Sequence, residues 1–218
     1  MKTNIVCMLA LFLCSFSVKA QVASTSGPLQ SAVAKLDQAR TAKEYETLEK
    51  EFARIAELQP KDWLPPYYAA YCNAKIGFLY QDDGEEIEPF SNRGEQEAQK
   101  SISLLDTVQQ KKELAEIYTV LSLVYRTKVF INPMTYGRKF GTLSQLYRGK
   151  AQQLDPANPR AIYVKAWELY NIPKMWGGDK DQAKQLANQS LGLLENAGTG
   201  VSPHWGKAEN GELLKKYK

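Results

Sequence analysis

Apolar residues recur at three- and four-residue spacing through most of the chain, and no stretch of strand length alternates between apolar and polar positions. Such spacing places the apolar side chains on one face of a helix. In residues 43–58, for example, Tyr45, Leu48 and Phe52 share one face, whereas Glu46 lies on the opposite one. The pattern predicts an all-α fold in which each helix buries one face against its neighbours.

The same periodicity divides the chain into helical pairs. We expect helices near 29–40 and 43–58, and then three hairpins, formed by 62–80 with 91–106, 111–131 with 139–154, and 158–172 with 179–195. A segment rich in Gly, Ser and Pro leads to a last short helix, which we expect to cover the exposed end of the stack. The predicted divisions are a signal peptide at 1–20, a linker at 21–28, a repeat domain at 29–195 and a C-terminal tail at 196–218.

Two segments of the chain repeat each other with a constant offset. Leu58-Gln59-Pro60-Lys61-Asp62, followed by Tyr67, Ala70 and Tyr71, recurs as Leu154-Asp155-Pro156-Ala157-Asn158, followed by Tyr163, Ala166 and Trp167. The proline stops one helix, and the Asp or Asn can cap the next. The aromatic pairs could line a groove, but their four-residue spacing beside an alanine favours packing between repeats.

A second repeat marks the turn inside a hairpin. Pro133-Met134-Thr135-Tyr136-Gly137 matches Pro173-Lys174-Met175-Trp176-Gly177. We expect the proline to end the first helix, the aromatic residue to plug the end of the hairpin, and one of Gly177 and Gly178 to adopt positive φ. Asp179 can then cap the second helix.

These repeats resemble the tetratricopeptide repeat superfamily, whose helical hairpins stack into a superhelix. The resemblance covers about residues 43–195, and its best motif is Leu-Asp-Pro-x-Asn-Pro-x-Ala at 154–161. The period departs from the superfamily's repeat of about 34 residues, so the repeats are degenerate. The layout is also similar to small exported helical-repeat proteins of Gram-negative bacteria. The resemblance implies that the first helices of the hairpins line a concave groove that binds peptides.

Composition and the N-terminus indicate the compartment. Lys2, an apolar run from Ile5 to Phe16 and Val18-Lys19-Ala20 are typical of an export signal cleaved after Ala20. The formal charge of +4 becomes +2 when Lys2 and Lys19 leave with the signal, which does not favour a nucleic-acid partner. We expect a periplasmic or secreted protein with no integral membrane segment after cleavage.

Polar residues on the first helices are the candidates for partner binding, because core packing does not need them. They are Asn73, Lys75, Arg126, Lys128 and Lys165. Their positive charge would suit a carboxylate or an acidic peptide; the alternative is an ordinary solvated helix face.

Other reactive positions are few. Cys72 is the only thiol outside the signal and is interpreted as structural, and His204 lacks the further His or Cys residues of a zinc site. The acidic run from Asp82 to Glu88 is interpreted as a solvated loop inside the first hairpin, with cation binding left open. Asp106-Thr107-Val108 resembles a bacterial O-glycosylation acceptor, and whether Thr107 is modified also stays open.

No catalytic motif is present in the sequence, and no cofactor or metal is expected. We therefore expect a non-enzymatic exported scaffold that binds a protein or peptide through the concave face of its first helices. The alternative is a receptor for a small molecule, such as a glycan or an acidic metabolite, held by aromatic and basic groove residues.

Overall fold

The computed structural model describes residues 26–195, 198 and 200–217, and the predicted signal peptide and most of the predicted linker lie outside them. The described residues form α-helices and one short 3-10 turn, with no strand among them. The all-α prediction is confirmed. The helices are α1 (Ser26–Leu36), α2 (Ala42–Leu58), α3 (Leu64–Leu79), α4 (Gly84–Ser103), α5 (Lys111–Ile131), α6 (Pro133–Leu154), α7 (Pro159–Asn171), α8 (Lys180–Leu194) and α9 (Lys207–Lys215).

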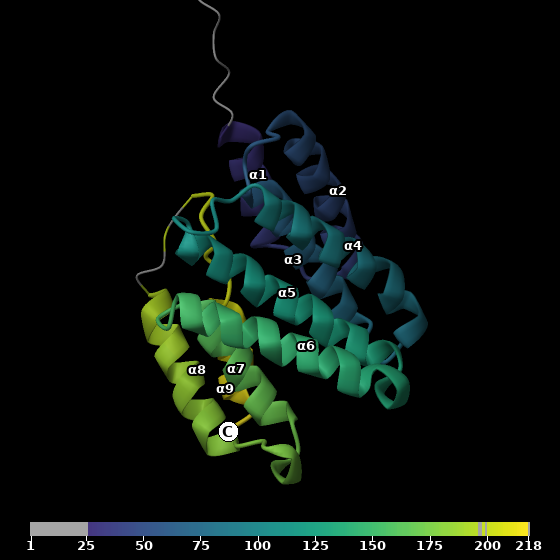
Figure 1. Ribbon diagram of the computed structural model, residues 1–218, viewed down its shortest axis with the longest axis vertical. Helices are drawn as coiled ribbons and strands as arrows, with labels where there is room; N and C mark the ends of the chain where they lie inside the picture. The colour runs from purple at the N-terminus through teal and green to yellow at the C-terminus, as the bar shows by residue number, and fades with distance from the viewer. Residues whose placement is uncertain (1–25, 196–197, 199, 218) are drawn as a thin grey trace, which may run out of the picture.

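Consecutive helices pair as antiparallel hairpins, and the hairpins follow one another along the molecule (Figure 1). The first helices of the hairpins, α3, α5 and α7, contact one another in chain order, so they form a continuous inner row. The largest fully buried side chains lie on this row and on α1, α2, α4 and α9. They include Phe52 of α2, Tyr67 of α3 and Leu121 of α5.

Local sequence explains where several helices begin. Thr41 caps α2 and accepts a hydrogen bond from the backbone N–H of Glu44, whose carboxylate accepts one from Thr41 in return. Asn158 and Asp179 cap α7 and α8 in the same way, each accepting from the backbone N–H three residues on. Each cap satisfies backbone donors that the first helical turn leaves unpaired.

Three helices, α1, α4 and α6, begin earlier than the sequence analysis predicted. Helix α6 begins at Pro133 rather than near 139, because Asn132 caps it and Pro133 occupies its first turn, where the missing N–H costs nothing. Residues 133–137 are therefore helix rather than a turn, and Gly137 does not have positive φ.

Helix α4 begins at Gly84 rather than near 91, so most of the acidic run from Asp82 to Glu88 is helical and not a loop. Glu85 and Glu86 lie in its first turn, where carboxylates interact favourably with the helix dipole. Similarly, α1 begins at Ser26, inside the segment predicted as a linker.

The turn between α7 and α8 contains the 3-10 turn Lys174–Trp176 and the left-handed residue Gly177, with φ of 92°. Trp176 does not plug the end of the hairpin, because it is 73% exposed and the neighbouring Met175 is 81% exposed. The backbone N–H of Gly178 donates to the carbonyl of Pro173, and that of Asp179 donates to the carbonyl of Leu169. The chain reverses direction here through backbone hydrogen bonds rather than through aromatic packing.

Candidate functional site

The C-terminal residues 201–217 lie along the inner row of first helices as well as against α8. Helix α9 contacts α8 at the end of the stack, as expected of a terminal helix. The segment before it also reaches α3, where the hydroxyl of Tyr68 donates to the carbonyl of Val201 at 2.8 Å. We refer to residues 201–206 as the strap. The tail therefore covers part of the face that the tetratricopeptide resemblance assigns to peptides.

Aromatic residues hold the strap against α3. The ring of Trp205 stacks on that of Tyr71 at 4.6 Å between centroids, and its indole N–H donates to the hydroxyl of Tyr67 at 2.7 Å. Tyr67 and Tyr71 are buried, with 0% and 3% of their surface exposed. Tyr163 of α7 is also buried, at 9% exposure, so these three rings leave little aromatic surface open to a partner.

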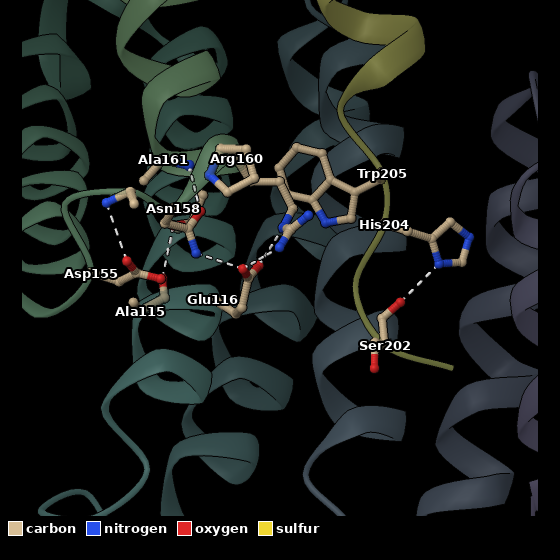
Figure 2. Close-up of polar contacts among 12 residues, drawn as sticks. Ala115, Glu116, Asp155, Asn158, Arg160, Ala161, Ser202, His204 and Trp205 are labelled. Carbon is tan, nitrogen blue, oxygen red and sulfur yellow. Dashed lines mark hydrogen bonds and ion pairs between the residues drawn. The ribbon is translucent and has the colours of Figure 1, made fainter. Parts of the chain in front are cut away.

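A buried ionic network lies beside the strap (Figure 2). Glu116 of α5 accepts hydrogen bonds from both Nε and Nη2 of Arg160, from the side-chain amide of Asn158, and from the hydroxyl of Tyr67 at 3.3 Å. Both Glu116 and Arg160 are almost fully buried, at 7% exposure each. The network joins α3, α5 and α7, so it fixes the inner row on which the tail lies.

The five candidate residues for partner binding do not form one open surface. Asn73 is fully buried and donates to the carbonyl of Ala69 at 3.0 Å, so it is not accessible to a partner. Lys128 is also buried, in an ion pair with Glu95. Arg126 pairs with the buried carboxylate of Glu168 and is 12% exposed. The expectation that core packing does not need these side chains is wrong for all three.

The other two candidates are more accessible. Lys165 is half-buried on α7. Lys75 pairs with Glu209 of α9 at 3.1 Å, and 25% of its side chain is exposed. Of the five, Lys75 lines a cavity near the tail.

That cavity is an open groove of about 490 Å³. It is lined by Arg40, Tyr45, Lys75, Tyr163, Trp167, Ala208, Glu209, Glu212, Leu213 and Lys216, and we refer to it as the α9 groove. Its walls come from α2, α3, α7 and α9, which are distant in sequence. Arg40, Tyr45, Ala208 and Glu209 also line a smaller cavity of about 180 Å³, so the α9 groove continues towards His204 and Trp205.

Charged groups in the α9 groove are partly neutralised inside the protein. Burial raises the pKa of Glu209, but Lys75, the backbone and the Tyr71 hydroxyl outweigh that effect and hold the pKa below its usual range. Glu209 is therefore a carboxylate at neutral pH, fixed by Lys75, by the Tyr71 hydroxyl at 2.9 Å and by the backbone N–H of Gly206 at 3.0 Å.

Remaining reactive residues are held in structural contacts. Burial raises the pKa of the Cys72 thiol well above its usual range, so this cysteine is not a thiolate at neutral pH. His204 bonds to the backbone carbonyl of Ser202 at 2.8 Å (Figure 2) and to Asp37, directly after α1, at 3.0 Å. Within the described part of the chain, no three residues among His, Cys, Asp and Glu group as a metal site.

Sequence reasoning missed Arg40, Tyr45, Leu213 and Lys216 as groove residues. Tyr45 was assigned to a packing face, and the lysines near the C-terminus were visible only as a basic tail. The sequence analysis interpreted Trp167 as a residue that packs between repeats. Its ring does pack edge-on against Phe78, with 5.3 Å between ring centroids, and it also lines the groove. No local signal indicated that the tail folds back to meet α2 and α7.

No family model matches the chain, and no curated protein does. Among solved structures, the chain is similar to the HusA haemophore from Porphyromonas gingivalis. The two share 28% sequence identity with a TM-score of 0.76, and the match covers 91% of this chain and 94% of that one. In the described residues, no helix is both long and apolar enough to cross a membrane. The chain is thus similar over nearly its whole length to a bacterial protein that is a haemophore.

Proposed function

We propose that this chain is an exported, non-enzymatic binding protein for haem or a closely related anionic tetrapyrrole, and that the α9 groove holds the ligand. The observation that carries the proposal is the likeness to a haemophore, at 28% identity over 91% of this chain. Export rests on the predicted signal peptide, and the compartment is then periplasmic or extracellular.

The size of the α9 groove supports a small ligand. Small-molecule sites are typically concave, with volumes of roughly 300–1,000 Å³, and the groove has about 490 Å³. A peptide lying along the inner row of first helices would have to displace α9 and the strap, which are held by the contacts of Tyr67, Tyr71 and Lys75. We therefore favour the small ligand over the protein or peptide partner.

The chemistry of the groove also supports a tetrapyrrole. Haem is a flat apolar ring that carries two carboxylates, so it needs an aromatic or aliphatic wall together with cations. Half-buried Trp167 supplies the accessible apolar surface, backed by the buried Tyr45 and Leu213. Arg40 and Lys216 supply exposed positive charge. Aromatic side chains contribute large apolar contact areas to such sites.

Titration of the mature protein with hemin, followed by Soret absorbance, tests the proposal. We expect a saturable change with one hemin per chain. Trp167→Ala should weaken binding, because it removes one wall of the groove, whereas Trp176→Ala removes an exposed aromatic residue outside the groove and should leave binding unchanged. A change that grows without saturation, as for hemin alone or with an unrelated protein, would contradict the proposal.

A further inference from the structure

The α9 groove contains more positive groups than the protein itself neutralises. Of its two carboxylates, Glu209 pairs with Lys75 at 3.1 Å and Glu212 pairs with Lys215 at 2.6 Å. Two of the cations that line the groove, Arg40 and Lys216, then form no ion pair with a carboxylate in the described part of the chain. An unpaired cation beside an apolar wall is a natural partner for a ligand carboxylate.

Arg40 is held in place without using all of its donors. One guanidinium nitrogen donates to the backbone carbonyls of Asp37 and Ala39, at 2.9 and 2.6 Å, where α1 ends. The backbone N–H of Arg40 donates to Glu44, whose carboxylate also accepts from Thr41 as part of the α2 cap. Because a guanidinium has five N–H donors, Arg40 can still bind a carboxylate at the end of the groove that joins the smaller cavity.

Lys216 follows the last turn of α9 and comes from a different part of the fold. Its ammonium lies 5.3 Å from the centre of the Tyr170 ring, a contact that orients the charge without neutralising it. It lines the α9 groove but not the smaller cavity that Arg40 also reaches. The two unpaired cations thus belong to two separate segments, the α1–α2 connection and the end of α9.

The wall between these segments offers apolar contact and no strong iron ligand. None of the ten lining residues is His, Cys or Met. Burial raises the pKa of Tyr45, so its side chain is a neutral phenol. Its hydroxyl proton is already donated to the carbonyl of Ala39 at 3.0 Å. Burial also raises the pKa of Tyr163 above its usual range. Recognition of a ligand in the groove therefore depends on the flat ring of the ligand and on its charged substituents, rather than on a bond to iron.

We propose that Arg40 and Lys216 are specificity-determining residues that bind the two carboxylates of a flat dicarboxylate ligand, whose ring lies against Trp167. This inference rests on the proposed function, and it adds the requirement for two free carboxylates. The groove then discriminates between a dianionic macrocycle and its neutral ester. Exposed cations contribute modestly to binding, so each should account for about a fivefold change in affinity.

The experiment compares protoporphyrin IX with its dimethyl ester, using fluorescence titration of the mature protein. Wild type should bind the diacid about tenfold or more tightly than the ester, since two charge contacts are lost together. Arg40→Gln and Lys216→Gln should each weaken diacid binding about fivefold and leave ester binding unchanged. Lys112→Gln, which removes an exposed charge at the start of α5, is the matched control and should change neither.

The outcomes separate the two proposals. If wild type binds neither hemin nor protoporphyrin IX, the proposed function fails and the inference fails with it. If wild type binds both, but the diacid and ester bind equally and the two glutamine variants match Lys112→Gln, the inference is overturned and the function stands. Thermal melts of the variants that match wild type would show that any loss of binding is local.

Discussion

The indole N–H of Trp205 donates to the hydroxyl of Tyr67 at 2.7 Å, across 138 residues of sequence. The Tyr67 hydroxyl donates in turn to the buried carboxylate of Glu116 on α5, which pairs with Arg160 of α7. A hydrogen-bonded chain therefore joins the strap to the ionic network inside the stack. Because α9 follows the strap directly, the position of one wall of the groove depends on this chain.

Trp205→Ala should destabilise the protein by about 3 kcal/mol, because it removes a half-buried indole and leaves the Tyr67 hydroxyl without a donor. Trp205→Phe keeps an aromatic ring against Tyr71 and should cost only about 1 kcal/mol for the lost hydrogen bond. Urea denaturation measures both. Equal stability of wild type and Trp205→Ala would mean that the strap does not anchor the tail.

Arg160→Met should destabilise the protein by about 3–5 kcal/mol, because the carboxylate of Glu116 stays buried without its main partner. The double variant Glu116→Leu with Arg160→Met removes both charges and should recover much of that loss. Denaturation midpoints of the single and double variants give the comparison. A double variant no more stable than Arg160→Met would show that uncompensated charge is not the cause.

The glycines of the α7–α8 turn should be sensitive to alanine for two different reasons. Gly177→Ala forces a side chain into positive φ and should cost about 1 kcal/mol. Gly178→Ala should cost more, because its Cβ would lie 1.7 Å from the carbonyl oxygen of Ile172. Gly192 lies inside α8 with open space around it, so Gly192→Ala is the control and should stabilise by about 0.5–1 kcal/mol. Calorimetric melting of the three variants tests this order of stabilities. A Gly178→Ala variant with the same melting temperature as wild type would contradict the turn geometry.

Acid should weaken the attachment of α9. The pKa of Glu209 in the folded protein lies below its ordinary value of 4.5, so the carboxylate stabilises the fold above that pH. The contribution is lost as the pH falls through the folded pKa. Glu209→Gln should therefore be less stable than wild type at pH 7, and the difference should shrink at pH values well below 4.5. Denaturation at several pH values measures it, and a difference that does not depend on pH would exclude Glu209 as the cause.

The fold class was predictable because helical periodicity and capping residues such as Asn158 and Asp179 are local signals. The helix starts at Gly84 and Pro133 were not predicted, because glycine is a poor helix former and Pro133 was interpreted as the end of the preceding helix rather than the first turn of the next. The groove was not predictable, because it forms only when the tail folds back onto α3 and α7. Polar residues on the first helices were predicted to bind a partner. Asn73 and Lys128 are instead buried by neighbouring helices, which no local pattern in the sequence identifies.

The location of bound hemin tests the central claim most directly. Amide chemical shifts of the labelled mature protein, recorded with and without one equivalent of hemin, would locate the ligand through its ring current and paramagnetism. We predict that the affected residues cluster around Tyr45, Trp167 and Leu213, with small changes at the exposed turn around Trp176. Saturable binding with effects centred on that turn, or no specific effects at all, would contradict the assignment of the α9 groove as a haem site.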